Sequence, residues 1–175
     1  VNAAPHARAG VPALGIGLPV TAGHEVTAEE ADGGFTLDNG LLRAVITSAG
    51  QLASLVDAVT GRDAIAPGDR GNRLQLHRDI PNAWDAWDVD EHYRRTVEEI
   101  DGVEEIRLES KPEEAAVVVV RSFGASRIEQ RLALAAGSPS LEITSTIDWH
   151  ERQKLLKLGF ELDVHADRSA AEIQF

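Results

Sequence analysis

The residues best suited to chemistry gather between positions 81 and 93 of this chain. This segment holds two of the three tryptophans, the one tyrosine, a histidine and four carboxylates. Trp84 and Trp87 could form a platform for the apolar face of a sugar ring, with Asp85 or Asp88 accepting hydrogen bonds from its hydroxyl groups. Alternatively, both indoles are buried and anchor a long loop to a sheet, since tryptophan buries a large area whenever it can. The sequence leaves both interpretations open.

A second cluster, residues 148–152, lies at the end of an expected strand. His150 and Glu151 could act as an acid/base pair, because imidazole titrates near neutral pH and a neighbouring carboxylate can raise its pKa. They could equally form a solvated ion pair in a turn. No serine stands in a recognisable nucleophile setting, so we assign no catalytic residue to this chain and count His150 and Glu151 among its candidate substrate-binding residues.

The spacing of the acidic and histidine residues argues against a metal site. Asp85, Asp88 and Asp90 are as close together as calcium ligands, but they lack the regular spacing and closing glutamate of an EF-hand. His6, His24, His77 and His165 show no zinc-ligand spacing, and there is no cysteine. With 29 acidic residues, the two carboxylates of a glycosidase cannot be chosen from sequence alone.

Composition narrows the classes of partner. The formal charge of −12 repels phosphate backbones, and no basic stripe offsets it, so we expect no nucleic acid. No apolar run is long enough to cross a bilayer, so we expect no membrane contact. The absence of cysteine and of a signal-peptide pattern favours a reducing cytoplasm.

Short apolar and polar alternations predict the elements that position these clusters. The turn at 38–40 should join strands 35–37 and 41–47. Two further hairpins are expected, one from 103–109 and 115–122 and the other from 126–135 and 141–149.

The remaining segments complete an all-β pattern. Residues 73–77 alternate as a half-buried strand that leads into the tryptophan segment, and 94–101 should be mostly irregular. Period-two spacing over 156–164 predicts one long strand that lies across a sheet with one apolar face. Many strands joined by hairpins, without a clear helical pattern, predict an antiparallel β-sandwich made of large sheets.

We divide the chain into a linker that leads into the domain, residues 1–32, with a possible edge strand at 11–20, and a β-sandwich domain, 33–175. There is no methionine, and the chain stops in a strand-like run. We therefore expect a piece of a longer polypeptide, with a sheet incomplete at the C-terminus. Such an exposed strand edge could pair with another copy and form a homo-oligomer.

Several segments, in order, resemble glycoside hydrolase family 38 α-mannosidases, in particular the cytosolic and bacterial branch. The matching pieces are 37–43 (LDNGLLR), 71–76 (GNRLQL), 81–88 (PNAWDAWD), 121–126 (RSFGAS), 148–157 (DWHERQKLLK) and 172–175 (EIQF).

The resemblance implies a galactose-mutarotase-like β-supersandwich. Full-length members of the family hydrolyse α-mannosidic bonds with retention, using an aspartate nucleophile and a zinc ion held by Asp and His in an N-terminal α/β barrel. None of those barrel motifs is present in this chain. The resemblance therefore implies the non-catalytic β-sandwich portion of such an enzyme, active in mannose metabolism and packed on its own barrel. By this resemblance the loop from Trp84 to Asp88 would face the cleft that binds the α-mannoside. The alternative is a stand-alone carbohydrate-binding or structural β module.

Overall fold

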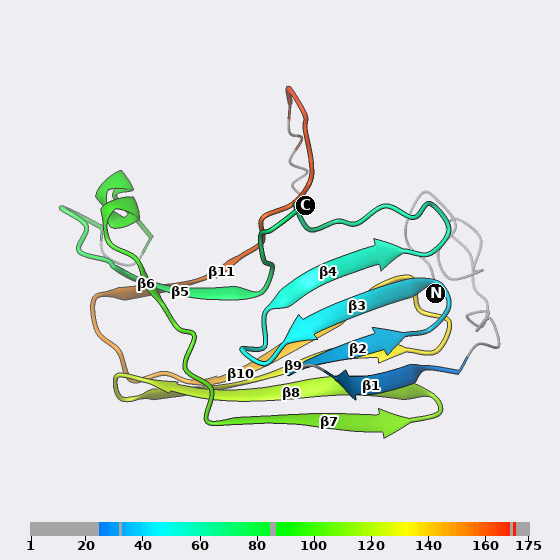
Figure 1. Cartoon of the computed structure of the whole chain (residues 1–175). Helices are drawn as coiled ribbons and strands as arrows, with labels where there is room; N and C mark the ends of the chain where they lie inside the picture. Colours follow the sequence, from blue (N-terminus) through cyan, green and yellow to red (C-terminus); the bar gives the residue numbers. More distant parts are fainter. Residues whose placement is uncertain (1–24, 32, 85–86, 169, 171–175) are drawn as a thin grey trace, which may run out of the picture.

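Three antiparallel sheets make up the described part of the chain. The computed structural model describes residues 25–31, 33–84, 87–168 and 170. These residues form eleven strands and one short 3-10 helix (Figure 1). The predicted antiparallel β-sandwich is confirmed. Within the described residues, no helix is long and apolar enough to cross a membrane.

The first sheet contains four strands that pair in chain order, β1-β2-β3-β4. Their bounds are β1 (Thr27–Ala31), β2 (Gly34–Asp38), β3 (Leu42–Thr47) and β4 (Leu52–Asp57). The predicted hairpin is confirmed, since Leu37 pairs with Ala44. Strand β1 lies within the segment that we assigned to the linker, whereas the possible strand at 11–20 lies outside the described residues. The domain boundary between residues 32 and 33 stays a prediction.

The second sheet has the strand order β10-β9-β8-β7. Both hairpins predicted for this region are confirmed, and Val117 at the centre of the sheet pairs with Leu108 on one side and Leu132 on the other. The bounds are β7 (Glu105–Lys111), β8 (Glu114–Phe123), β9 (Ser126–Ala135) and β10 (Glu142–Asp148).

The third sheet has the order β11-β5-β6 and includes the strand predicted at 73–77. Its strands are β5 (Arg73–Arg78), β6 (Glu98–Glu99) and β11 (Lys154–Gly159), and the 3-10 helix η1 (Glu91–Arg95) lies between β5 and β6. The expectation that 94–101 is mostly irregular holds for only half of the segment, because Arg94 and Arg95 end η1 and Glu98–Glu99 form β6.

The prediction of one long strand over 156–164 is wrong. Strand β11 pairs with β5 only up to Gly159, which lies opposite Arg73, the first residue of β5. Beyond that point β5 offers no partner, because the preceding Asn72 has a positive φ of 56°. The chain therefore continues against another segment, where Leu162 forms an isolated bridge with Ile65. The apolar residues of this stretch are consequently not covered along one face.

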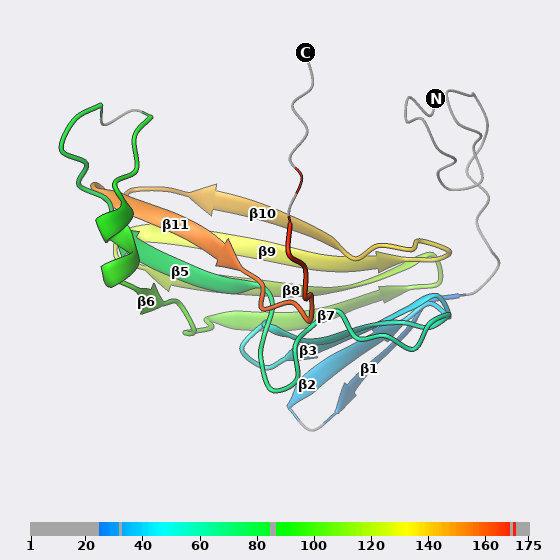
Figure 2. The ribbon, with the colours of Figure 1, turned by 90° about the horizontal axis from the view of Figure 1, so that it is seen from above.

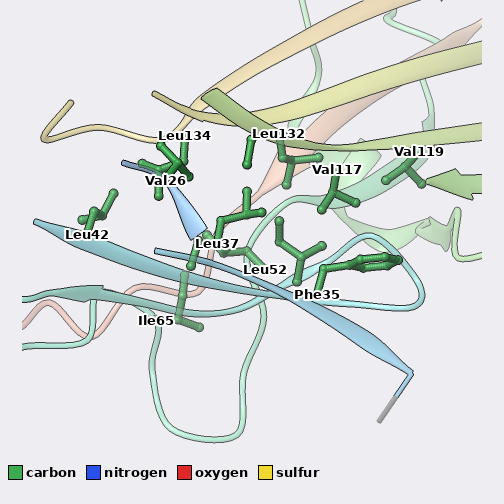
Figure 3. Close-up of a cluster of buried hydrophobic side chains, with 13 residues drawn as sticks. Val26, Phe35, Leu37, Leu42, Leu52, Ile65, Val117, Val119, Leu132 and Leu134 are labelled. Atoms are coloured by element: carbon green, nitrogen blue, oxygen red, sulfur yellow. The ribbon is translucent and has the colours of Figure 1, made fainter. Parts of the chain in front are cut away.

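The main core lies between the first and second sheets. Val117, Val119 and Leu132 project from the second sheet toward Phe35 and Leu37 of the first (Figure 3). Successive side chains of a strand point to opposite faces of the sheet, and residues paired across two strands share a face. Every second side chain of β8 and β9 therefore points into this core layer. All five side chains are buried.

A second buried cluster occupies the other end of the same face. Phe123 and Ile128 of the second sheet pack with Leu74 and Leu76 of β5 and with Ile100. The second sheet is thus the base on which both smaller sheets rest (Figure 2). This arrangement fixes the third sheet, and with it the tryptophan loop, at one end of the molecule.

Candidate functional site

The tryptophan loop joins β5 to β6 and projects from the third sheet at one end of the molecule (Figure 1). Its two indoles are exposed: 68% of Trp84 and 80% of Trp87 is accessible. The ring centroids are 6.4 Å apart and the ring planes differ by 14°, so the indoles lie nearly parallel. The interpretation of both rings as buried anchors does not hold.

A local turn brings the two indoles together. Trp84 has a φ of 60°, and its carbonyl accepts hydrogen bonds from the amides of Trp87 at 3.0 Å and Asp88 at 2.9 Å. Asp88 is half-buried behind this turn. Asp85, the other predicted hydrogen-bonding carboxylate, lies outside the described residues.

Polar contacts close the base of the loop. The backbone amide and the side-chain amide of Asn82 both donate to Oδ2 of Asp90, each at 2.8 Å. His92 Nε2 lies 3.1 Å from the carbonyl oxygen of Ile80, which is the length of a hydrogen bond donated by an N–H group to that oxygen. Asn82, His92 and Ile80 line an open pocket at the base of the loop, together with Arg78 and Thr96. The loop therefore carries two exposed, nearly parallel indoles and has hydrogen-bonding groups at its base.

A buried histidine and the tyrosine attach the loop to the third sheet, a role that the sequence pattern did not predict. His77 lies on β5, and its Nδ1 is 2.6 Å from the carbonyl oxygen of Thr96. Tyr93 on η1 contacts the His77 ring edge-on, with centroids 5.1 Å apart. Lys157 on β11 donates to the Tyr93 hydroxyl at 2.8 Å, and this hydrogen bond holds the pKa of Tyr93 below its ordinary value. The sequence offered one indication of this role: His77 occupies an alternating position in a predicted strand that leads directly into the aromatic loop.

In the second cluster, Glu151 binds the turn between β8 and β9 rather than His150. Its Oε1 accepts the amide of Ala125 at 2.8 Å and the hydroxyl of Ser126 at 3.0 Å. These hydrogen bonds, led by that of Ala125, lower the pKa of the Glu151 carboxyl. Gly124 has a φ of 54°, and a Cβ there would collide with the Glu151 carboxylate.

The side chain of His150 has a different partner from that of the Glu151 side chain. Its Nε2 lies 2.9 Å from Oδ1 of Asp148, and its backbone amide donates to the Ser126 hydroxyl at 2.8 Å. The His150 side chain is exposed. The geometry thus matches the interpretation as a turn with a solvated ion pair more closely than an acid/base pair of His150 with Glu151.

Both clusters lie at the same end of the molecule (Figure 1). The amide of Asp79, at the start of the tryptophan loop, donates to the carbonyl of Gln153 at 2.9 Å. Because Gln153 directly follows the second cluster, this hydrogen bond ties the two segments together. Their side chains serve different purposes: the tryptophans are presented to solvent, whereas Glu151 holds a turn. Among the described residues, no group of three His, Asp or Glu side chains is placed to hold a metal ion.

Comparison with known proteins identifies the family. The family model for the "Glycosyl hydrolases family 38 C-terminal domain" matches residues 37–175. The chain belongs to glycosyl hydrolase family 38. The matched region of the family 38 domain includes both clusters and ten of the eleven strands at least in part, and only β1 lies wholly before it.

Three curated relatives carry α-mannosidase names. The chain is 35% identical over 150 residues to alpha-mannosidase 2C1 of Homo sapiens and, equally, of Mus musculus, an alignment that covers 84% of this chain and 14% of each relative. It is 28% identical over 166 residues to alpha-mannosidase G of Dictyostelium discoideum, which covers 91% of this chain and 15% of the relative. This family 38 chain thus spans about one-seventh of the length of the relatives that it matches.

Proposed function

We propose that this chain is the β-sandwich portion of a retaining α-mannosidase and that it does not itself catalyse hydrolysis. The observation that carries the proposal is the match of residues 37–175 to a domain named C-terminal, in a family whose matched relatives are named α-mannosidases. In this proposal the nucleophile and the zinc ion belong to an N-terminal barrel outside these residues. A galactose-mutarotase-like form of the sandwich and a cytoplasmic location are parts of the same proposal.

The chemistry of the described residues supports a non-catalytic role. A glycosidase needs one carboxylate that attacks or activates water and another that donates a proton. Glu151 is bound to backbone and hydroxyl donors, and Asp90 is bound by Asn82. The described residues also lack a ligand set for zinc. Glu151 and Asp90 are thus used to shape the turn and the loop.

The tryptophan pair is the feature of this domain best suited to contact a sugar or the barrel. Burial of an aromatic face is strongly favourable, and keeping two indoles exposed forgoes that gain. Contact of Trp84 and Trp87 with a pyranose ring or with the barrel surface would recover it. We place this pair, with Asp85 and Asp88, at the rim of the α-mannoside site in the complete enzyme.

Hydrolysis of an aryl α-mannoside with added zinc tests the assignment. The longer protein should release the aryl group, whereas this 175-residue chain should give no turnover above that of buffer containing zinc. Robust turnover by the 175-residue chain alone would contradict the non-catalytic role. A longer protein without α-mannosidase activity would contradict the assignment to the enzyme.

The second candidate, a stand-alone carbohydrate-binding module, is favoured by the exposure of Trp84 and Trp87. Titration of the 175-residue chain with mannose or mannobiose, followed by tryptophan fluorescence, distinguishes the two. Saturable quenching that Trp87→Ala abolishes and Trp149→Phe retains would identify a binding module. Absence of a response would favour a loop that needs the barrel to complete its site.

A further inference from the structure

Among the described residues, two sheets end in a strand edge without a partner strand, and both edges lie on the same flank of the molecule (Figure 2). Strand β10 is the outermost strand of the second sheet, and β11 is the outermost strand of the third. Within the part of the chain that the structure describes, each of them pairs with a strand on one side only. The outer edges of β10 and β11 thus present backbone groups without a strand partner.

Three large apolar side chains on or next to these edge strands border the second buried cluster. Ile147 of β10 pairs with buried Ile128 and shares its face, and Leu158 of β11 does the same with buried Leu74. Both neighbours belong to the second buried cluster.

Trp149 borders the same cluster, because its ring lies 6.0 Å from that of buried Phe123. Ile147, Leu158 and Trp149 nevertheless remain 44%, 41% and 39% exposed. We call these three residues the open seam. Inward-facing apolar residues at the margin of a core are ordinarily covered, so the open seam has the properties of an interface.

We propose that the open seam is the docking site of one extended segment of the longer polypeptide, from outside these 175 residues. The segment adds as a β-strand to the edge of β10 or β11 and places alternate apolar side chains over Ile147, Leu158 and Trp149. A strand fits this site because it satisfies an edge and fills the space behind it with every second side chain. This inference rests on the proposed function, which makes the chain part of a longer enzyme.

Charge disfavours a second copy of this chain as the occupant. Each copy carries a formal charge of −12, which opposes self-association. A two-fold antiparallel pairing of β10 about Ser145 would also set Glu142 opposite Asp148 of the second copy, twice. Like charges directly opposite each other destabilise a strand pair. The matched relatives, by contrast, have ample additional chain, since the alignment covers only 14% of the human protein.

Because the chain contains no cysteine, single-cysteine variants report directly on this site. Ile147→Cys and Leu158→Cys should react readily with a maleimide in the 175-residue chain. In the longer protein, both cysteines should react at no more than about one-tenth of that rate, since labelling would require local opening. The matched control is Thr146→Cys, an exposed position on the opposite face of β10, which should react at similar rates in both proteins. Mass spectrometry of labelled peptides separates these sites from other cysteines of the longer protein.

Each other outcome overturns the proposal in an identifiable way. Full reactivity of both seam cysteines in the longer protein would show that nothing covers the seam. Equal protection of Thr146→Cys would indicate burial of the whole flank by a domain rather than a strand. Protection already in the 175-residue chain would indicate a second copy if sedimentation gives a dimer, and the chain's own ends if it gives a monomer.

Controls for folding and for the proposed function keep these results separate. Far-UV circular dichroism checks that each variant keeps its β structure, and Leu158→Cys provides a second test if Ile147→Cys does not fold. Hydrolysis of an aryl α-mannoside is measured in parallel. Protected seam cysteines in a longer protein that lacks this activity would overturn the proposed function and leave the docking proposal standing.

Discussion

Arg121 is the largest fully buried side chain among the described residues, and it carries a charge. Its Nη1 donates to Gln130 at 3.0 Å and its Nη2 to the carbonyl of Ala49, and no described carboxylate lies within ion-pair distance. Burial lowers the pKa of the guanidinium. Gly50 is required beside it, because a Cβ there would lie 2.7 Å from Nη2 of Arg121. At the residue scale, this contact fixes the turn between β3 and β4 on the second sheet.

Arg121→Ala should lower the free energy of unfolding by about 2 to 4 kcal/mol. The substitution removes the side-chain donor of the Ala49 carbonyl and leaves Gln130 Oε1 with only the 3.3 Å hydrogen bond from Asn72. An unsatisfied buried group costs about 1 to 3 kcal/mol, and the loss of a large buried side chain adds the cost of a cavity. Urea denaturation measures the change. Arg127→Ala is the control, since its half-exposed side chain has only a 3.8 Å contact with Glu104 and should change stability by less than about 1 kcal/mol. Equal losses in both variants would contradict the role of Arg121.

Glu151→Gln should destabilise the protein at neutral pH, and the difference should vanish in acid. The hydrogen bonds from Ala125 and Ser126 lower the folded-state pKa of Glu151 below its ordinary value of 4.5. A carboxyl with a depressed pKa contributes stability above its unfolded pKa and loses it as the pH falls through the folded pKa. Urea midpoints measured from pH 7 downward should therefore converge below about pH 4.5. Glu91→Gln, at an exposed side chain, should show no such convergence, and parallel curves for Glu151→Gln would contradict the assignment.

At the scale of the elements, Asn39 joins the first sheet to the second. Its Oδ1 accepts the amides of Leu41 and Leu42, and its Nδ2 donates to the carbonyls of Ala135 and Ser138, both at 2.8 Å. The side chain is completely buried. One residue thus shapes the β2–β3 turn and holds it against the β9–β10 turn.

Asn39→Ala should therefore cost about 2 to 4 kcal/mol of stability, because it leaves several backbone groups unsatisfied. Thermal or urea unfolding measures this loss. The neighbouring Asp38→Asn should be tolerated within about 0.5 kcal/mol, since the Asp38 side chain accepts only an exposed local hydrogen bond from the Gly40 amide. A loss below about 0.5 kcal/mol for Asn39→Ala would show that Asn39 does not link the sheets.

At the scale of the whole molecule, net charge and free strand edges act against each other. The charge of −12 keeps copies apart, whereas the edges of β10 and β11 and the open seam favour association. Salt weakens only the first effect, since the Debye length falls from about 30 Å at 0.01 M to about 3 Å at 1 M ionic strength.

The 175-residue chain should therefore be a monomer at low ionic strength and should associate increasingly as salt is raised. Sedimentation velocity at about 0.01 M and about 1 M salt measures this shift. Ile147→Lys, which adds a charge to the open seam, should reduce the association at high salt. A strict monomer under both conditions at high protein concentration would contradict the prediction.

The sequence by itself determined the local structure. Period-two patterns and turn residues such as Gly40, which has a φ of 77°, act over a few residues, so the hairpins and the antiparallel sandwich could be predicted. The tryptophan segment could likewise be recognised as the candidate site from residue types alone. The ordered family 38 segments were visible in the sequence as well, and comparison with known proteins confirmed them.

Only the tertiary structure decided which side chains face solvent and which distant groups they bind. Trp84 and Trp87 could have been buried, because an indole suits a core as well as a surface. Glu151 serves the turn at Ala125, a partner that no local pattern identifies. The apolar alternation over 156–164 looked like one strand, yet β11 ends at Gly159 because its partner β5 begins at Arg73. A strand's length and its exposed face depend on the neighbour that pairs with it, and that neighbour is set by the packing of the whole chain.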